Sequence, residues 1–175
     1  MILVTGPSSG GKSLWAEKYA DSLQKPVVYI ATGLINERDK EWTNRLNKHK
    51  IRRPGEWVVY ESSDELIATI NSINRKNTLI IDSLGGFVSV NLKKKIDDWN
   101  NICDDLISVL VLFSGTLVIV TEEVGWSLTP LSSTGRQFVE RLGLLNQKIQ
   151  HISNKVILVI QGMAIDLSAI QVKDI

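Results

Sequence analysis

The 175-residue sequence predicts an α/β fold built on a mainly parallel central sheet. Three observations predict it. Short runs rich in Val, Ile and Leu alternate along the chain with longer stretches of helical spacing. The first apolar run opens onto a glycine-rich loop that leads into a helical pattern. Residues 78–82 are apolar almost throughout and end in a carboxylate, as a buried parallel strand often does at its functional end.

The first part of the chain reads as strand, helix, strand, helix. Residues 2–5 are apolar, and the helical pattern at 14–20 ends before Pro26, which cannot continue a helix. Residues 27–32 are β-rich and stop at a glycine. Residues 36–51 are polar and helix-prone, and their acidic residues come early and their basic residues late, which complements the helix dipole.

The middle of the chain adds two strands and a helix. Residues 57–60 form a third strand candidate that ends in Glu61. Ser and Asp residues before 66–70 supply caps for the next helix. The apolar run 78–82 then gives the fourth strand.

The last part continues the alternation to the end of the chain. We expect a helix at 98–113, a strand at 116–121, a helix at 132–154 and a strand at 155–160. Residues 164–167 are expected to pair back as an antiparallel edge. Because no repeat or linker divides the chain, we predict a single domain over residues 1–175.

The loop after the first strand fits the pattern Gly-x-x-x-x-Gly-Lys-Ser between a strand and a helix, the context that a phosphate-binding P-loop requires. Its backbone N–H groups can turn toward phosphate oxygens, Lys12 can reach the terminal phosphates, and Ser13 can ligate Mg²⁺. A chance Gly/Ser turn is the weaker interpretation. The predicted triphosphate-binding residues are Gly6, Pro7, Ser8, Ser9, Gly10, Gly11, Lys12 and Ser13.

Several carboxylates follow predicted strands. Asp82 comes at the end of the fourth strand, and we expect it to hold Mg²⁺ together with Ser13. The alternative is an Asp that only caps a turn. Glu61, Glu122 and Glu123 also lie at strand ends, where a metal, a sugar hydroxyl or a proton could engage them.

A basic cluster between residues 45 and 53 surrounds one histidine in a chain whose charge is otherwise balanced. Arg45 and His49 are four residues apart, hence on one face of the predicted helix, where an imidazole can attack an α-phosphate. A solvated basic face is the competing interpretation. His151 lies near the end of a predicted helix and is interpreted as structural.

Composition limits the remaining classes of function. Lys and Arg number 20 against 19 Asp and Glu, so no overall basic field favours nucleic acid or a membrane surface. Cys103 is the one cysteine and is expected to be a buried thiol. We expect no signal peptide, no membrane span and a cytoplasmic location.

The sequence resembles the bifunctional adenosylcobinamide kinase/adenosylcobinamide-phosphate guanylyltransferases over nearly its whole length. The matching motifs, in order, are residues 2–6 with the P-loop, 29–32, Arg45-Leu46-x-x-His49, Arg53-Pro54, Trp57, Glu61, 82–84, 123–125, Pro130, Arg136 and 146–147. The pattern departs from that of many members at Ser9, at Glu122 and at residues 126–129.

The resemblance implies a P-loop NTPase fold of the RecA-like type and an assembly of three identical chains. It also implies two reactions that use ATP or GTP: phosphorylation of adenosylcobinamide, then transfer of GMP from GTP to the phosphate through a guanylyl-histidine. His49 matches the histidine that is guanylylated. The implied guanine-nucleotide contacts are Ala31, Thr32, Gly33, Lys50, Ile51, Arg52, Arg53, Glu61 and Asp82.

Two other functions stay open at this point. One is a small-molecule kinase with the same P-loop but no covalent nucleotide intermediate, in which the cluster around His49 only binds phosphates. The other is a switch ATPase whose hydrolysis drives a change of shape.

Overall fold

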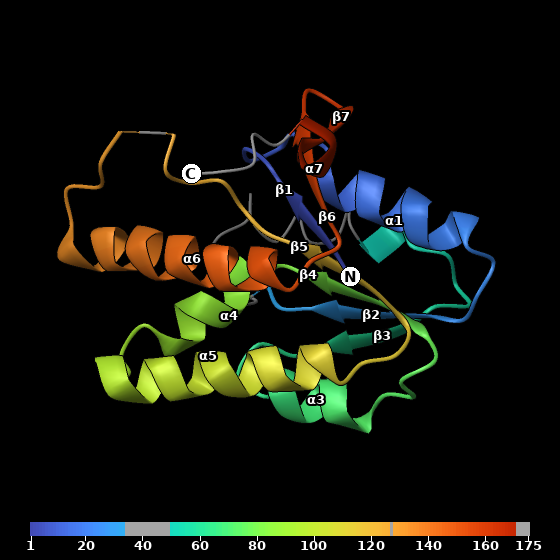
Figure 1. Cartoon of the computed structure of the whole chain (residues 1–175), viewed down its shortest axis with the longest axis horizontal. Coiled ribbons are helices and arrows are strands. Elements are labelled where there is room, and N and C mark those ends of the chain that lie inside the picture. Colours follow the sequence, from blue (N-terminus) through green and yellow to red (C-terminus); the bar gives the residue numbers. More distant parts are fainter. Residues whose placement is uncertain (34–49, 127, 171–175) are drawn as a thin grey trace.

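A seven-stranded sheet forms the centre of the molecule, in the order β3-β2-β4-β5-β1-β6-β7 (Figure 1). The computed structural model describes residues 1–33, 50–126 and 128–170. All neighbouring strands are parallel except β6 and β7. The predicted mainly parallel α/β fold with an antiparallel C-terminal edge is therefore confirmed.

The elements alternate along the described chain as expected for a parallel sheet. The strands are β1 (Ile2–Thr5), β2 (Val27–Ala31), β3 (Val58–Glu61), β4 (Thr78–Asp82), β5 (Thr116–Val120), β6 (Lys155–Ile160) and β7 (Met163–Asp166). The helices are α1 (Lys12–Ser22), α3 (Leu66–Ser72), α4 (Leu84–Asn91), α5 (Ile96–Val111), α6 (Ser133–His151) and α7 (Leu167–Ile170).

The predicted strands and most predicted helices match these elements to within three residues at their ends. Most of the helix predicted at 36–51 lies outside the described residues, and only residues 50–52 of this stretch are seen, in helical conformation. Helix α4 was not predicted. It contains Gly85 and Gly86, which disfavour a helix in isolation.

Alternating side chains divide the sheet into two apolar layers, because successive residues of a strand point to opposite faces. One layer includes Leu3, Leu79 and Ile81, which pack with α3, α4, α5 and α6. The other includes Val4 and Ile80, which pack with buried alanines of α1. Figure 1 shows α3, α5 and α6 on one side of the sheet and α1 on the other.

A buried arginine ties α6 to the end of α4. Arg141 is 4% exposed, and its guanidinium donates hydrogen bonds to the carbonyls of Asn91, Leu92 and Lys94 at 2.7–3.2 Å. These carbonyls belong to the last turn of α4 and the residues after it, where helical carbonyls lack partners within the helix. Arg141 thus fixes the position of α4 against α6.

In the part of the chain that the structure describes, no helix is both long enough and apolar enough to cross a bilayer.

The Cys103 thiol should be inert in the native protein. It lies on α5 in the apolar layer, 2% exposed, and burial raises its pKa to about 11. Because the thiolate is the reactive form, we expect no reaction with a disulfide reagent at mildly alkaline pH until denaturant is added. Rapid stoichiometric reaction of the folded protein would contradict this placement.

Candidate active site

The loop between β1 and α1 is shaped by contacts that only glycine permits. Gly6 has φ +143°, and a Cβ there would lie 2.2 Å from the backbone oxygen of Val159 on β6. Gly11, the N-cap of α1, has φ +101°. These are conformations that side chains disfavour, so the sequence pattern and the backbone geometry agree. The loop thus stands against β6 with the helix start directly after it.

Lys12 curls back over this loop. Its residue is 7% exposed, and Nζ donates a hydrogen bond to the carbonyl of Pro7 at 2.8 Å. The carbonyl holds the ammonium at the loop, where the partial positive charge of the α1 N-terminus adds to it. The arrangement suits an anion, as the sequence pattern predicts.

Strand register brings the carboxyl ends of five strands into one row. Ala31 pairs with both Glu61 and Asp82, and Asp82 pairs with Val120, which in turn pairs with Val4. The phosphate loop begins two residues after Val4. The carboxylates of β3 and β4 and the loop therefore belong to the same edge of the sheet, as predicted.

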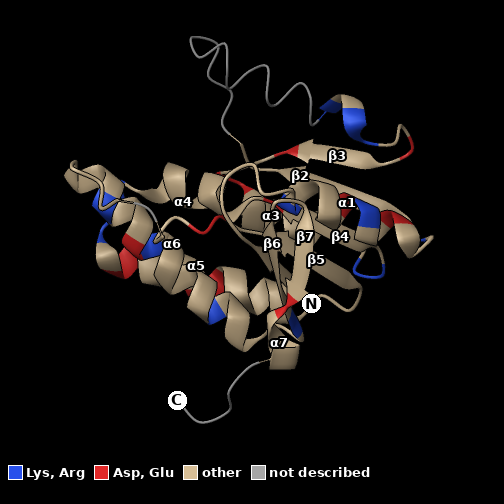
Figure 2. Ribbon diagram, turned by 90° about the horizontal axis from the view of Figure 1, so that it is seen from above, with Lys and Arg blue, Asp and Glu red and all other residues tan. Residues whose placement is uncertain are grey.

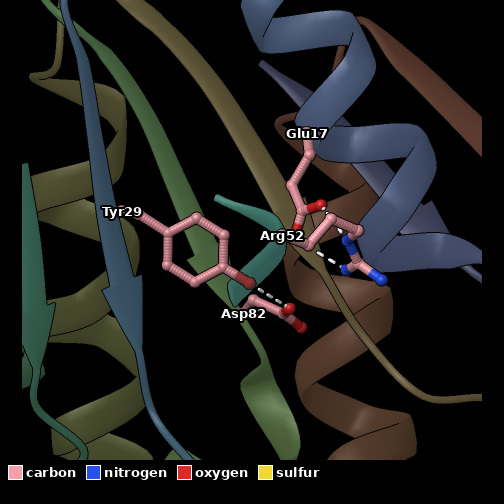
Figure 3. Close-up of polar contacts among 4 residues, drawn as sticks. All are labelled: Glu17, Tyr29, Arg52 and Asp82. Carbon is pink, nitrogen blue, oxygen red and sulfur yellow. Dashed lines mark hydrogen bonds and ion pairs between the residues drawn. The ribbon is translucent and has the colours of Figure 1, made fainter. Parts of the chain in front are cut away.

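Asp82 is held by a buried tyrosine. The Tyr29 hydroxyl donates a hydrogen bond to Asp82 Oδ2 (Figure 3). Burial raises the pKa of Tyr29 well above its usual value, and the charge of Asp82 acts in the same direction, so the hydroxyl remains a donor. The guanidinium of Arg53 lies over the Tyr29 ring, 3.8 Å from its centroid, and makes a cation–π contact.

Two of the cations at 50–53 form ion pairs, although both side chains remain partly exposed. Arg52 forms a two-pronged ion pair with Glu17 of α1, with Nη2 2.8 Å from Oε1 (Figure 3). Lys50 pairs with Glu61 at the end of β3. Figure 2 shows these Lys and Arg residues in the helical turn beside β3. A purely solvated basic face does not describe these residues.

A cleft of about 410 Å³ lies beside these ion pairs. It is lined by Lys50, Arg53, Pro54, Gly55, Trp57, Val59 and Glu61. Its combination of an indole, two cations and a carboxylate can accept a planar base together with polar groups. Ile51, also predicted from the sequence as a nucleotide contact, is 85% exposed and is not among the residues that line this cleft.

A second polar network lies between β2, β4 and β5. Ser83 N donates to Thr32 Oγ1 at 2.8 Å, and the Ser83 hydroxyl donates to Glu122. Glu122 also accepts a hydrogen bond from Gly85 N, at the start of α4, at 3.1 Å. Burial raises the pKa of Glu122, although the hydrogen bond from Ser83 opposes the shift. This network links the residue after Asp82 to the residues after β5.

Asp82 and Ser13 supply oxygen donors of the kind that Mg²⁺ prefers. Among the described residues, no group of three or more His, Cys, Asp or Glu side chains could hold a metal ion by itself. One or two protein ligands are enough for Mg²⁺, because this ion commonly keeps bound waters and takes further ligands from substrate phosphates. The donor set thus fits a nucleotide-bound Mg²⁺.

Comparison with known proteins identifies the family. The family model described as cobinamide kinase / cobinamide phosphate guanyltransferase matches residues 2–167. The chain belongs to this family. This confirms the assignment made from the sequence motifs, and with it a phosphotransferase and nucleotidyltransferase of cobalamin biosynthesis.

Curated relatives that align over nearly their whole length agree with the family assignment. The bifunctional adenosylcobalamin biosynthesis protein CobU of Escherichia coli (strain K12) is 32% identical, with 95% of this chain and 99% of the relative covered. CobU of Salmonella typhimurium (strain LT2) is 30% identical over 95% and 99% of the two chains. CobP of Pseudomonas aeruginosa is 28% identical over 94% and 95%.

Solved structures with low identity show the fold alone. A Pyrococcus horikoshii OT3 protein has a TM-score of 0.55 at 9% identity, covering 95% of this chain and 85% of the other. An ATPase from the type III secretion system of pathogenic bacteria also has a TM-score of 0.55, at 13% identity, covering 99% of this chain and 58% of the other. Both resemble this chain in fold, which agrees with the predicted α/β architecture.

The structure of this cobinamide kinase family member brings together most of the site residues predicted from sequence. Residues 6–13, 31–33, Glu61 and Asp82 meet at the carboxyl edge of the sheet, with residues 50–53 beside them. His49 and Arg45 lie outside the described residues. Residues not predicted for the site are Glu17, Tyr29 and Ser83. The nearest sequence signal is that Tyr29 lies within a family motif and Ser83 follows Asp82.

The Arg52–Glu17 pair should matter more than an exposed ion pair. The Glu17 side chain is 7% exposed and Arg52 34%, whereas Lys148 and Asp104, 2.7 Å apart, are 43% and 68% exposed. Removing one partner of a buried pair costs about 3–5 kcal/mol, so for half-buried Arg52→Ala we expect a loss of about 1–3 kcal/mol in unfolding free energy.

The control is Lys148→Ala, for which we expect a loss of about 0–1 kcal/mol. Urea denaturation of both variants measures the difference. If the two substitutions lower the unfolding free energy equally, the Arg52–Glu17 pair contributes no more to stability than an exposed ion pair.

Proposed function

We propose that this chain carries out two successive reactions on cobinamide: phosphorylation of its free hydroxyl by a nucleoside triphosphate, then transfer of GMP from GTP to the new phosphate. The observation that carries the proposal is the shared sheet edge. The phosphate loop, Lys12 and Asp82 stand in one row with the base-accepting cleft at residues 50–61. Both reactions need a triphosphate held at that edge.

In the first reaction the loop and Lys12 orient the γ-phosphate toward the incoming alcohol. Oxygen of the alcohol forms a bond to phosphorus while the bond to the nucleoside diphosphate breaks, and the alcohol proton passes to a nearby carboxylate, Asp82 or Glu61, or to water. Positioning and charge stabilisation supply most of the catalysis in such transfers. Bound Mg²⁺, held by Ser13 and Asp82, would neutralise charge that develops on the phosphate oxygens.

In the second reaction the neutral imidazole of His49 attacks the α-phosphorus of GTP. A nitrogen–phosphorus bond forms and the bond to pyrophosphate breaks. The phosphate oxygen of cobinamide phosphate then displaces the imidazole and completes the new phosphoanhydride. Lys50, the residue after His49, pairs with Glu61, which supports a place for this chemistry at the same sheet edge. Ala31, Thr32, Gly33, Arg52 and Arg53 complete the proposed nucleotide contacts.

The location, assembly and cofactor that we propose are those that the family resemblance implies. We infer a cytoplasmic enzyme that works as a homotrimer on a small corrinoid, with ATP and GTP as nucleotide substrates and Mg²⁺ as cofactor. We do not propose that the protein binds DNA or RNA, because its positive and negative charges are nearly equal in number.

His49→Ala should abolish covalent labelling by GTP that carries a radioactive α-phosphate. Phosphorylation of cobinamide should continue, because that transfer needs no histidine. Acid-labile label on the wild-type chain, detected after denaturation, is the measurement. Undiminished label on the variant would remove His49 from the reaction, and an unlabelled wild-type chain would favour a kinase without a covalent intermediate.

Lys12→Ala should slow both reactions by about 100-fold or more, since a positioned cation is lost from the site of charge development. Lys18→Ala serves as the matched control, because Lys18 lies exposed on the same helix. Rates of cobinamide phosphorylation and of GMP transfer are compared in the three proteins. Wild-type rates for Lys12→Ala would contradict the triphosphate assignment.

A further inference from the structure

A second cleft opens at the same edge of the sheet but on its other face. Its volume is about 410 Å³, and it lies between the ends of β1 and β5 and one side of α6. Leu3 of its wall belongs to the apolar layer under α3 to α6, whereas Tyr29 and Trp57 belong to the layer on the α1 side. The nucleotide contacts and this cleft therefore approach the phosphate loop from opposite faces.

Backbone hydrogen bonds join the cleft to the phosphate loop. Glu123 N donates to the carbonyl of Gly6 at 3.0 Å, and Thr121 N donates to the carbonyl of Val4 at 2.9 Å. Both Glu123 and Thr121 line the cleft. A molecule bound there would lie beside the first residue of the loop that holds the terminal phosphates.

Carboxamides give the cleft its chemical character. Asn146, Gln147 and Gln150 line it from α6. The Asn146 Oδ1 accepts a hydrogen bond from the Thr121 hydroxyl at 2.7 Å, which orients the amide. Primary amides both donate and accept, so they match a ligand that carries amides of its own.

Among the described residues that line the cleft, the charged ones are Glu122 and Glu123, both acidic, and none is Lys, Arg or His. Such a surface disfavours phosphates and so disfavours a second nucleotide. It suits a neutral or positively charged molecule. The cations near the loop, Lys50, Arg52 and Arg53, line or adjoin the α1 side instead.

We propose that this cleft binds the corrinoid body of the acceptor through hydrogen bonds between its peripheral carboxamides and Asn146, Gln147 and Gln150. The inference rests on the proposed function and adds a binding site for the corrinoid acceptor. The acceptor arm then reaches the loop at Gly6, while the nucleotide enters from the α1 side. The two substrates meet without competing for one pocket.

Gly143 offers a way to block the cleft without disturbing the fold. It lines the cleft in the middle of α6, and a Cβ built on it meets nothing within 4 Å. Replacing a helical glycine raises helix propensity. A large side chain at this position should therefore occupy the cleft rather than strain the helix.

The test compares Gly143→Trp with Leu144→Trp, a tryptophan at the next position of the same helix, where Leu144 is 50% exposed and outside this cleft. For Gly143→Trp we expect the KM for cobinamide to rise at least about tenfold. Covalent labelling by GTP, which needs no corrinoid, should stay at the wild-type level. Leu144→Trp should match the wild type in both.

A second pair of variants covers the case in which Gly143→Trp does not fold. Gln147→Leu removes an exposed amide that lines the cleft. Its control is Gln137→Leu, which removes an amide on the same helix outside the cleft. We expect a higher KM for cobinamide only in Gln147→Leu.

The outcomes separate this inference from the proposed function. If the wild-type chain phosphorylates cobinamide and both cleft variants keep its KM, the cleft is not the acceptor site. If the wild-type chain neither binds nor phosphorylates cobinamide, the proposed function falls and this inference falls with it. If the variants lose labelling by GTP as well, the cleft affects the nucleotide and the assignment is wrong.

Discussion

The parallel register of β2, β4, β5 and β1 is the constraint on which the rest of this molecule depends. It sets Ala31, Asp82, Val120 and Val4 side by side, so the segments that follow these strands emerge together. A one-residue slip in any pair would turn apolar side chains out of their layers and separate Asp82 from the phosphate loop. The chemistry therefore depends on the same pairing that buries the two cores.

The two faces of the sheet give the shared edge two different environments. On the α1 face, Glu17, Tyr29 and Asp82 hold Arg52, Arg53 and their neighbours in a dense charged network beside the phosphate loop. On the α6 face, amides and two carboxylates border an open cleft. If the proposed assignments hold, the sheet separates the anionic nucleotide from the amide-bearing acceptor, and the two meet only at its edge. Such a separation would let one small chain hold two large substrates.

Much of this arrangement could be predicted from the sequence, because its signals are local. The glycine loop, the apolar run that ends at Asp82 and the antiparallel end each lie within a few consecutive residues. The Arg52–Glu17 pair could not be predicted, since 35 residues separate its members and each reads alone as a surface charge. Helix α4 was missed for a related reason.

Propensity argues against α4, and tertiary contact overrides it. A Cβ on Gly86 would lie 2.1 Å from the carbonyl oxygen of Thr32, so the close approach of α4 to the end of β2 requires glycine. Arg141 then caps the carbonyls at the far end of the helix. Such contacts are properties of the assembled fold and leave no periodic signal in the chain.

The most direct measurement is a crystal structure of the protein with a non-hydrolysable GTP analogue and Mg²⁺. We predict β- and γ-phosphates on the backbone N–H groups of the loop and on Lys12, with the metal beside Ser13 and Asp82. A nucleotide whose phosphates lie away from this loop, with Asp82 turned from the metal, would contradict it.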